Sequence, residues 1–151
     1  MEIEIKSFRE LSLDELYAII KLRVDVFVVE QECPYPELDD KDQKSLHVLC
    51  WKKGELVAYA RLLPENISYP EASIGRFVVR QDQRKHGYGK VLMSGCLDFI
   101  INRWGCDSIK IQAQNYLKDF YKSFGFKAIT SPYLEDGIPH IDMILNNTRP
   151  K

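Results

Sequence analysis

The sequence lacks long apolar runs and has few cysteines and histidines. In 151 residues no hydrophobic stretch approaches the roughly 20 residues of a membrane-spanning helix, so we expect no membrane partner. The four cysteines lie far apart without a C-x-x-C pair, and only three histidines accompany them. This scarcity argues against a zinc site and favours free buried thiols in a reducing cytoplasm. The acidic, alternating N-terminal segment MEIEIKSFRE is not typical of a signal peptide, so we expect a cytoplasmic protein.

The sequence also lacks a strong excess of charge of one sign. Its net charge of −1 argues against a general nucleic-acid binder. Two segments nevertheless differ: residues 30–44 hold six carboxylates against two lysines, and residues 76–90 hold five Arg or Lys against Asp82. These segments predict one surface that prefers cations and one that prefers anions, although solvated loops show the same pattern.

Composition and periodicity describe one α/β domain over residues 1–151. Hydrophobic residues make up 45% and charged residues 28%, with no linker or internal repeat. Apolar periodicity predicts strands at residues 2–8, 46–52, 55–63, 72–79, 108–113, 126–130 and 140–146, and helices at 13–32, 88–104 and 116–124. The segments 33–45 and 131–139 are then loops. This order predicts a mixed, mostly antiparallel sheet flanked by helices, in which two βα units place parallel strands next to each other.

The stretch from residue 74 to residue 90 is the most informative part of the chain. An apolar strand ends in the basic turn Arg84-Lys85-His86-Gly87-Tyr88-Gly89, and an amphipathic helix follows at once. Unpaired backbone N–H groups and the helix dipole favour an anion at such a helix start, and the glycines allow close approach. The turn therefore indicates a phosphate or pyrophosphate site, with an ordinary strand-to-helix turn as the alternative.

Two segments in these contexts resemble the signatures of the GNAT superfamily of N-acetyltransferases. Arg84-x-x-Gly87-x-Gly89 matches the R/Q-x-x-G-x-G/A signature, and residues 120–126, FYKSFGF, match the F-Y-x-x-x-G-F segment. Residues 26–42 and 133–143 are similar to the ElaA-type branch, as are Arg23 and residues 112–114. The resemblance runs from the first helix to the last strand, and it implies an acyl-CoA-dependent N-acyltransferase that uses acetyl-CoA as co-substrate and no metal.

The resemblance also implies where acetyl-CoA binds. Its pyrophosphate would lie over the turn and the helix start, on Arg84, Lys85, His86, Gly87, Tyr88, Gly89 and Lys90. The preceding strand would splay from its neighbour, so that the pantetheine arm pairs with Phe77, Val78 and Val79. The Val78 N–H would then face the thioester oxygen. Many members have Asn where this chain has Gln114, so the pantetheine contact falls to Gln114 or Asn115.

The same resemblance suggests the groups that move protons. Tyr121 would protonate the leaving thiolate, although a tyrosine in this setting can simply be a core residue. The strand that carries a Glu base in other members offers Arg76 instead. The candidates for the base are the acidic or imidazole side chains Glu30, Asp39, Asp42, Glu135, Asp136 and His140, of which Glu30 and His140 are favoured. The acidic segment 30–44 favours a cationic amine acceptor, such as a polyamine, a lysine or a free amino group.

Two other functions remain open at this stage. A CoA-binding module without catalysis, serving in sensing or assembly, would also keep the glycine turn. An acyl-homoserine-lactone-type synthase is similar in one segment, formed by Arg23, Val26, Phe27, Glu30 and Gln31. The sequence does not decide whether the chain forms a homodimer.

Overall fold

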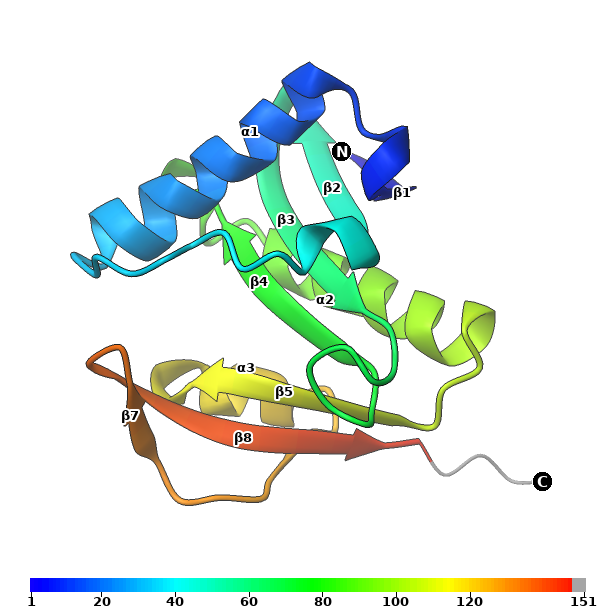
Figure 1. Cartoon of the computed structure of the whole chain (residues 1–151), viewed down its shortest axis with the longest axis vertical. Coiled ribbons are helices and arrows are strands. Elements are labelled where there is room, and N and C mark those ends of the chain that lie inside the picture. The colour runs from blue at the N-terminus through cyan, green and yellow to red at the C-terminus, as the bar shows by residue number, and fades with distance from the viewer. Residues whose placement is uncertain (148–151) are drawn as a thin grey trace.

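The computed structural model describes residues 1–147 as one α/β unit (Figure 1). Its strands are β1 (Glu2–Ser7), β2 (Leu46–Lys52), β3 (Glu55–Leu63), β4 (Ser73–Val79), β5 (Ser108–Gln114), β6 (Lys127–Ala128), β7 (Tyr133–Glu135) and β8 (Ile138–Asn146). Its helices are α1 (Leu13–Arg23), α2 (Tyr88–Asp98) and α3 (Lys118–Lys122). π-Helical turns extend α1 through Val24–Glu30 and α2 through Phe99–Arg103, which agrees with the two long predicted helices.

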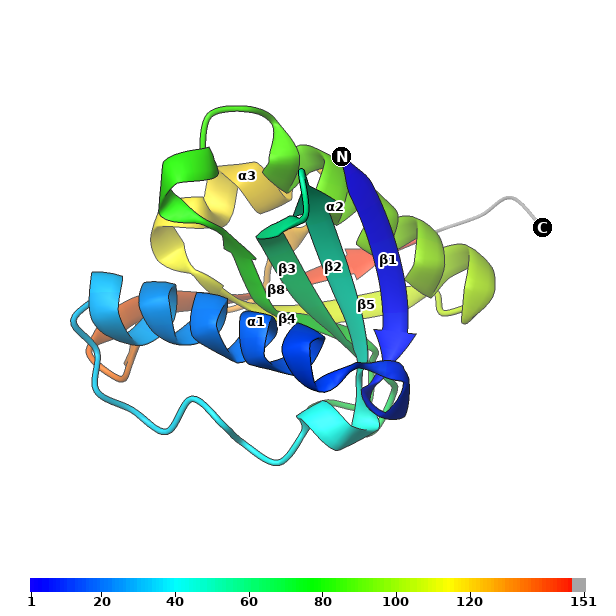
Figure 2. The same cartoon turned by 90° about the horizontal axis from the view of Figure 1, so that it is seen from above.

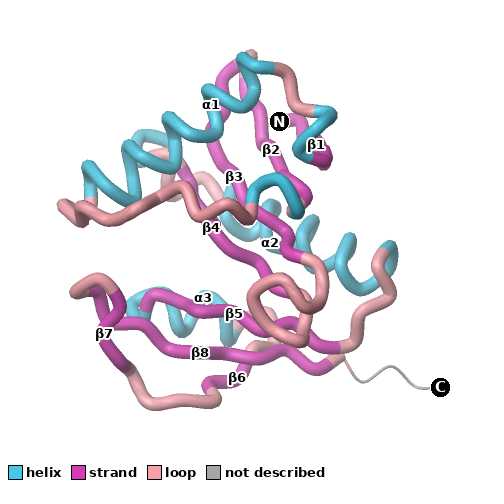
Figure 3. The backbone as a smooth tube through the Cα atoms, in the orientation of Figure 1, coloured by secondary structure: helices cyan, strands magenta, loops and turns pink. Residues whose placement is uncertain are grey.

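The strands form two antiparallel sheets that meet at one point. The first sheet has the order β1-β2-β3-β4 and the second the order β5-β8-β6, with β7 paired to β8. The sheets join through a single parallel bridge between Ala72 and Ile109, where the Lys110 N–H donates to the Ala72 carbonyl at 2.9 Å. From this bridge β4 and β5 diverge (Figures 1 and 3), which confirms the expected splay. The second parallel pair is not formed, because β8 lies between β5 and β6.

The helices cover both faces of the first sheet (Figure 2). On one face Ile19 and Leu22 of α1 pack against Leu49 and Tyr59. On the other face Leu92, Met93 and Cys96 of α2 pack against the residues that alternate with these, including Val48 and Ala58. Successive side chains of a strand point to opposite faces, so both sides of β2 and β3 are buried. Ser12 caps α1 in a capping box, its hydroxyl accepting from the Glu15 N–H at 3.0 Å.

The C-terminal third differs most from the sequence prediction. The strand expected at residues 126–130 is reduced to the two residues of β6. The segment 131–139, expected as a loop, contains β7 and a tight turn at Asp136 and Gly137, both with positive φ, that leads into β8. Asp-Gly is a strong hairpin signal, because it tolerates left-handed backbone at both positions. The loop assignment overlooked this signal.

The predicted free buried thiols are confirmed. The four cysteines, Cys33, Cys50, Cys96 and Cys106, are free and buried. Within residues 1–147 no group of His, Cys, Asp or Glu side chains could hold a metal ion. In the same range no helix is long and apolar enough to span a bilayer.

Candidate active site

A cavity of about 900 Å³ opens where β4 and β5 separate. One wall is β4 together with the turn that follows it, and the other is β5, α3 and the β7–β8 turn. Among the predicted residues it is lined by Phe77, Val78, Val79, Arg84, Lys85, Gly87, Tyr88, Gly89, Gln114, Tyr121 and His140. His86, Lys90, Asn115 and Glu30 are not part of this lining. The fold thus brings most of the predicted site to one place.

The glycine turn is shaped to leave the start of α2 accessible. Gly87 is the N-cap residue of α2, has a φ of 80°, and offers no side-chain cap to the helix. The first N–H groups of this 11-residue helix are therefore open to a ligand. Gly89 lies against Phe120 and Val79, where an added Cβ would be 3.7–3.8 Å from their side chains. Asp82 does not reach this site, since its carboxylate pairs with Arg80 at 2.6 Å.

Arg84 and Glu30 form an ion pair that the sequence did not predict. The Arg84 Nη1 and Nη2 atoms donate to the two Glu30 oxygens at 2.7 and 2.8 Å, and its Nε donates to the Val79 carbonyl at 3.1 Å. The hydrogen bonds that Arg84 donates to Glu30 raise the pKa of Arg84. Glu30 is therefore paired with Arg84 and lies outside the cavity lining.

β4 carries a bulge within the cavity wall. The β3–β4 register shifts between Tyr59 and Arg61, so that Arg76 and Phe77 together oppose one residue of β3. Arg76 has a φ of 49°, an uncommon value for a long side chain. The Phe77 ring lies 5.7 Å from Phe120 and 6.3 Å from Tyr121, measured between ring centroids. The bulge therefore sets the directions of the side chains that face the cavity.

Tyr121 lies deep in the cavity with its hydroxyl unengaged. Its ring packs edge-on against Phe120 at 5.3 Å and Phe126 at 6.0 Å. No residue within 1–147 makes a hydrogen bond to its hydroxyl, and that oxygen is not sealed from the cavity. Burial raises the pKa of Tyr121, with smaller contributions from Tyr116 and Cys96. The phenol is therefore held protonated with a free O–H group.

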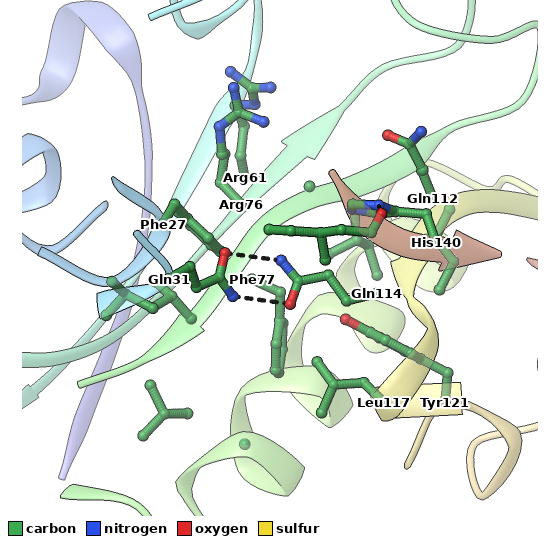
Figure 4. Close-up of a pocket in the computed structure, with 18 of the residues that line it drawn as sticks. Phe27, Gln31, Arg61, Arg76, Phe77, Gln112, Gln114, Leu117, Tyr121 and His140 are labelled. Atoms are coloured by element: carbon green, nitrogen blue, oxygen red, sulfur yellow. Dashed lines mark hydrogen bonds between the residues drawn. The ribbon is translucent and has the colours of Figure 1, made fainter. Parts of the chain in front are cut away.

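Gln114 makes a contact that the sequence did not predict. Its amide and that of Gln31 exchange two hydrogen bonds, at 2.9 and 3.1 Å. The pair joins the end of the extended α1 to the end of β5, on opposite sides of the splay. Figure 4 shows Gln114 between Gln31 and Tyr121. Gln31 lies in the segments that resemble the ElaA-type branch and the lactone synthases, and neither resemblance predicted its contact with Gln114.

His140 faces the cavity from β8. Its Nδ1 lies 2.7 Å from the Ile138 carbonyl, which can only accept, so Nδ1 carries the proton and Nε2 is the free acceptor. His140 is paired in the sheet with Gln114 on one side and Tyr133 on the other. Glu135 and Asp136 of the β7–β8 turn line the same region. Of the two favoured candidates for the base, His140 thus lines the cavity and Glu30 does not.

Three carboxylates of the acidic segment 30–44 are paired with arginines instead of being left free for a cationic acceptor. Glu37, Asp39 and Asp42 pair with Arg23, Arg61 and Arg76 in what we call the arginine–carboxylate cluster. Arg23 is fully buried and donates to Glu37 at 2.9 Å and Asp42 at 2.8 Å. Burial alone would raise the pKa of Asp42, but the hydrogen bonds and charges of Arg23 and Arg61 outweigh it and lower that pKa. The cluster's formal charges cancel, so the charge count of this segment no longer supports a cationic acceptor.

Comparison with known proteins identifies the class to which this fold and site belong. A family model described as Acetyltransferase (GNAT) domain matches residues 16–147, and the chain belongs to this family. The fold is that of an acyl-CoA N-acyltransferase.

Individual relatives place the chain more narrowly, in the ElaA-like part of the family. Protein ElaA of Escherichia coli is 45% identical over 136 residues, 89% of each chain. The crystal structure of ElaA matches with a TM-score of 0.89 over 97% of this chain and all of that one, at 41% identity. An acyl-CoA N-acyltransferase from Pseudomonas aeruginosa matches with a TM-score of 0.90 at 39% identity, over 96% and 99% of the two chains.

The lactone-synthase alternative is similar in fold alone. A CoA-dependent acyl-homoserine lactone synthase, BjaI, determined with SAM and isopentyl-CoA, has a TM-score of 0.80 at 20% identity. The match covers 97% of this chain and 83% of the synthase. The similarity at Arg23 and Gln31 therefore goes with a shared fold, and it does not identify a substrate of this chain.

Proposed function

We propose that the chain transfers an acetyl group from acetyl-CoA to a primary amine by direct attack. One observation carries this proposal: the free hydroxyl of the buried Tyr121 and an uncapped helix start open into the same cavity, beside the diverging edge of β4. Proteins of the same fold were determined with isopentyl-CoA and with coenzyme A, which supports a CoA thioester as donor. Those two structures do not identify the acyl group that this chain transfers.

The donor would use the wall formed by β4 and the glycine turn. The pyrophosphate would accept hydrogen bonds from the N–H groups at the start of α2, with Lys85 nearby. Arg84 would join it by exchanging its Glu30 partner for phosphate oxygens. The pantetheine arm would run along Phe77, Val78 and Val79 toward Tyr121, and the Val78 N–H would polarise the thioester carbonyl. Gln114 would contact the arm.

The residues around the reacting atoms would then handle two protons. His140 Nε2 would accept a proton from the acceptor ammonium group, directly or through water. The free amine nitrogen would form a bond to the thioester carbon, and the C–S bond would break. The departing CoA sulfur would take the Tyr121 proton, and the remaining amine proton would leave to restore the tyrosine. Burial raises the pKa of Tyr121, so the hydroxyl stays protonated until the thiolate develops.

The non-catalytic alternative is distinguished by turnover. Wild-type protein would be given acetyl-CoA and a panel of primary amines, and release of the CoA thiol would be followed. We expect release that depends on the amine. Tight acetyl-CoA binding without release for any amine would instead support a sensing or assembly module. No binding of acetyl-CoA by calorimetry would contradict both.

A further inference from the structure

The end of the cavity away from Tyr121 is built around arginines. Arg61 of β3 and Arg76 of β4 lie side by side there (Figure 4) and share Asp39 as a partner. Of the three arginines in the arginine–carboxylate cluster, Arg23 and Arg61 have side chains only 1% and 4% exposed, whereas that of Arg76 is 21% exposed. Arg76 is therefore the guanidinium that a bound molecule can reach.

Arg76 is held rigidly on one edge and is free on the other. Its Nε donates to Glu37 at 2.5 Å and its Nη2 to the Glu37 carbonyl at 2.9 Å. Its Nη1 makes no hydrogen bond to any residue within 1–147. The β4 bulge and the positive φ of Arg76 direct the side chain to this place, and such strain persists only where the surroundings impose it. A preorganised guanidinium with open N–H groups suits a planar carboxylate.

The charges around this end are divided between two walls. The formal charges of the arginine–carboxylate cluster sum to zero. Beside it the Lys41 ammonium group, which among the described residues bonds only the neutral Ser68 hydroxyl at 2.9 Å, adds positive charge to the lining. The buried Nε of Arg61 also has no partner among the described residues. The facing β7–β8 turn carries Glu135 and Asp136, for which the described residues supply no ion pair. One wall therefore favours an anion and the other a cation.

We propose that the acceptor is an amine that also carries a carboxylate, as a free amino acid does. Its carboxylate binds Arg76 with help from Lys41, and its ammonium group lies toward Glu135, Asp136 and His140, where it loses its proton. This inference rests on the proposed function for the fate of the amine, but the carboxylate contact is a matter of binding alone. It replaces the purely cationic acceptor suggested by the charge of segment 30–44.

The test compares amino acids with their carboxamides, which keep the size and the amine but lose the negative charge. Binding of L-phenylalanine, L-lysine and L-glutamine and of their amides to CoA-saturated protein is measured by calorimetry, and thiol release from acetyl-CoA is measured in parallel. We expect at least one acid to bind tenfold or more tightly than its amide. Equal affinities, or no binding of any of the six, would overturn the inference.

Substitutions test whether Arg76 causes the preference for acids over amides. In Arg76→Gln, Glu37 keeps its bond to Arg23, so no carboxylate is left unpaired and the fold should persist. We expect the acid-over-amide ratio to fall to near one in this variant and partly in Arg76→Lys. Arg80→Gln changes a matched arginine that, among residues 1–147, pairs only with Glu55 and Asp82 outside the cavity, and it should keep the ratio. An unchanged ratio in Arg76→Gln would overturn the assignment.

The two proposals fail in different ways. Thiol release with amides as good as that with acids would keep the transferase and overturn the carboxylate contact. Selective binding of acids with no thiol release from any amine would keep the contact and overturn the transferase.

Discussion

At the scale of single residues, the site depends on which polar groups are already engaged. Glu30 and His140 were the favoured candidates for the base from sequence, and of the two the structure places only His140 in the cavity lining. Both Glu30 oxygens bind Arg84, whereas His140 keeps a free Nε2 in the cavity. Partners 54 residues apart in the chain leave no local pattern, so sequence reasoning had no means of finding this pair.

Tyr121→Phe tests the acid. The ring contacts with Phe120 and Phe126 are kept, and the lost hydroxyl has no partner within the described residues, so stability and CoA affinity should stay near those of the wild type. We expect kcat for thiol release to fall about 100-fold or more, the usual loss for a general acid. The control is Tyr17→Phe on the exposed side of α1. Unchanged turnover would remove Tyr121 from the chemistry.

Glu30→Gln tests whether Glu30 competes with the pyrophosphate for Arg84. Exposed ion pairs are worth about 0–1 kcal/mol, so freeing Arg84 should tighten CoA binding by up to about fivefold. Calorimetry at low and moderate salt would show the gain and its decline as salt rises. Glu55→Gln, which loosens an exposed pair with Arg80, is the control. A large fall in kcat with unchanged CoA affinity would instead restore Glu30 as the base.

At the scale of elements, the sequence predicted the glycine turn, the strand before it and the two long helices. These elements carry local signals: a run of apolar residues, glycine at fixed spacing, and helical periodicity. The bulge in β4 and the β7–β8 hairpin were not predicted. A bulge is an offset between two strands, so β4 alone could not reveal it, whereas the hairpin did have an Asp-Gly signal at Asp136 that was read as part of a loop.

Two glycines of the turn make a matched pair for experiment. Gly87 has a φ of 80°, a left-handed backbone conformation that alanine disfavours. Gly87→Ala should therefore lower the free energy of unfolding by roughly 1–2 kcal/mol or displace the first N–H groups of α2. We expect acetyl-CoA affinity to fall at least tenfold. Gly89→Ala meets only ordinary protein contacts at 3.7–3.8 Å, so it should keep the melting temperature of the wild type and lose less affinity than Gly87→Ala. Calorimetry and melting temperatures would compare the two, and the reverse order would contradict this account of the turn.

At the scale of the whole molecule, the tertiary structure neutralises carboxylates that the sequence shows only as an acidic segment. Segment 30–44 was predicted to be a solvated or substrate-binding acidic loop, yet three of its six carboxylates meet buried or half-buried arginines. The arginines come from α1, β3 and β4, so their convergence is a product of tertiary structure. Composition could show the excess of carboxylates but not their partners.

His47 links this buried network to pH. Its Nε2–H donates to the Asp42 carbonyl at 2.9 Å, and its Nδ1 accepts from the Tyr59 hydroxyl at 2.6 Å. Burial lowers the pKa of His47, and nearby Arg23 and Arg61 lower it further. The unfolded chain therefore takes up a proton near pH 6.5 that the folded chain resists, so stability should decline as pH falls below about 6.5.

Denaturant unfolding between pH 8 and pH 5 would measure this decline. One proton contributes at most about 1.4 kcal/mol per pH unit. His47→Gln should lower the overall stability but flatten the dependence in this range, since an amide does not titrate. An equally steep decline in both proteins would show that His47 is not its source.

The four buried thiols have a consequence for an enzyme that handles a thioester. Burial raises the pKa of Cys50 and Cys106, and that of Cys96 to about 12, so these sulfurs stay protonated and are poor nucleophiles. The Cys33 thiol, in the cavity lining, donates to the Asp136 carbonyl at 3.4 Å. The protein should therefore resist acylation by its own donor, and prolonged incubation with acetyl-CoA should leave the intact mass of the folded chain unchanged.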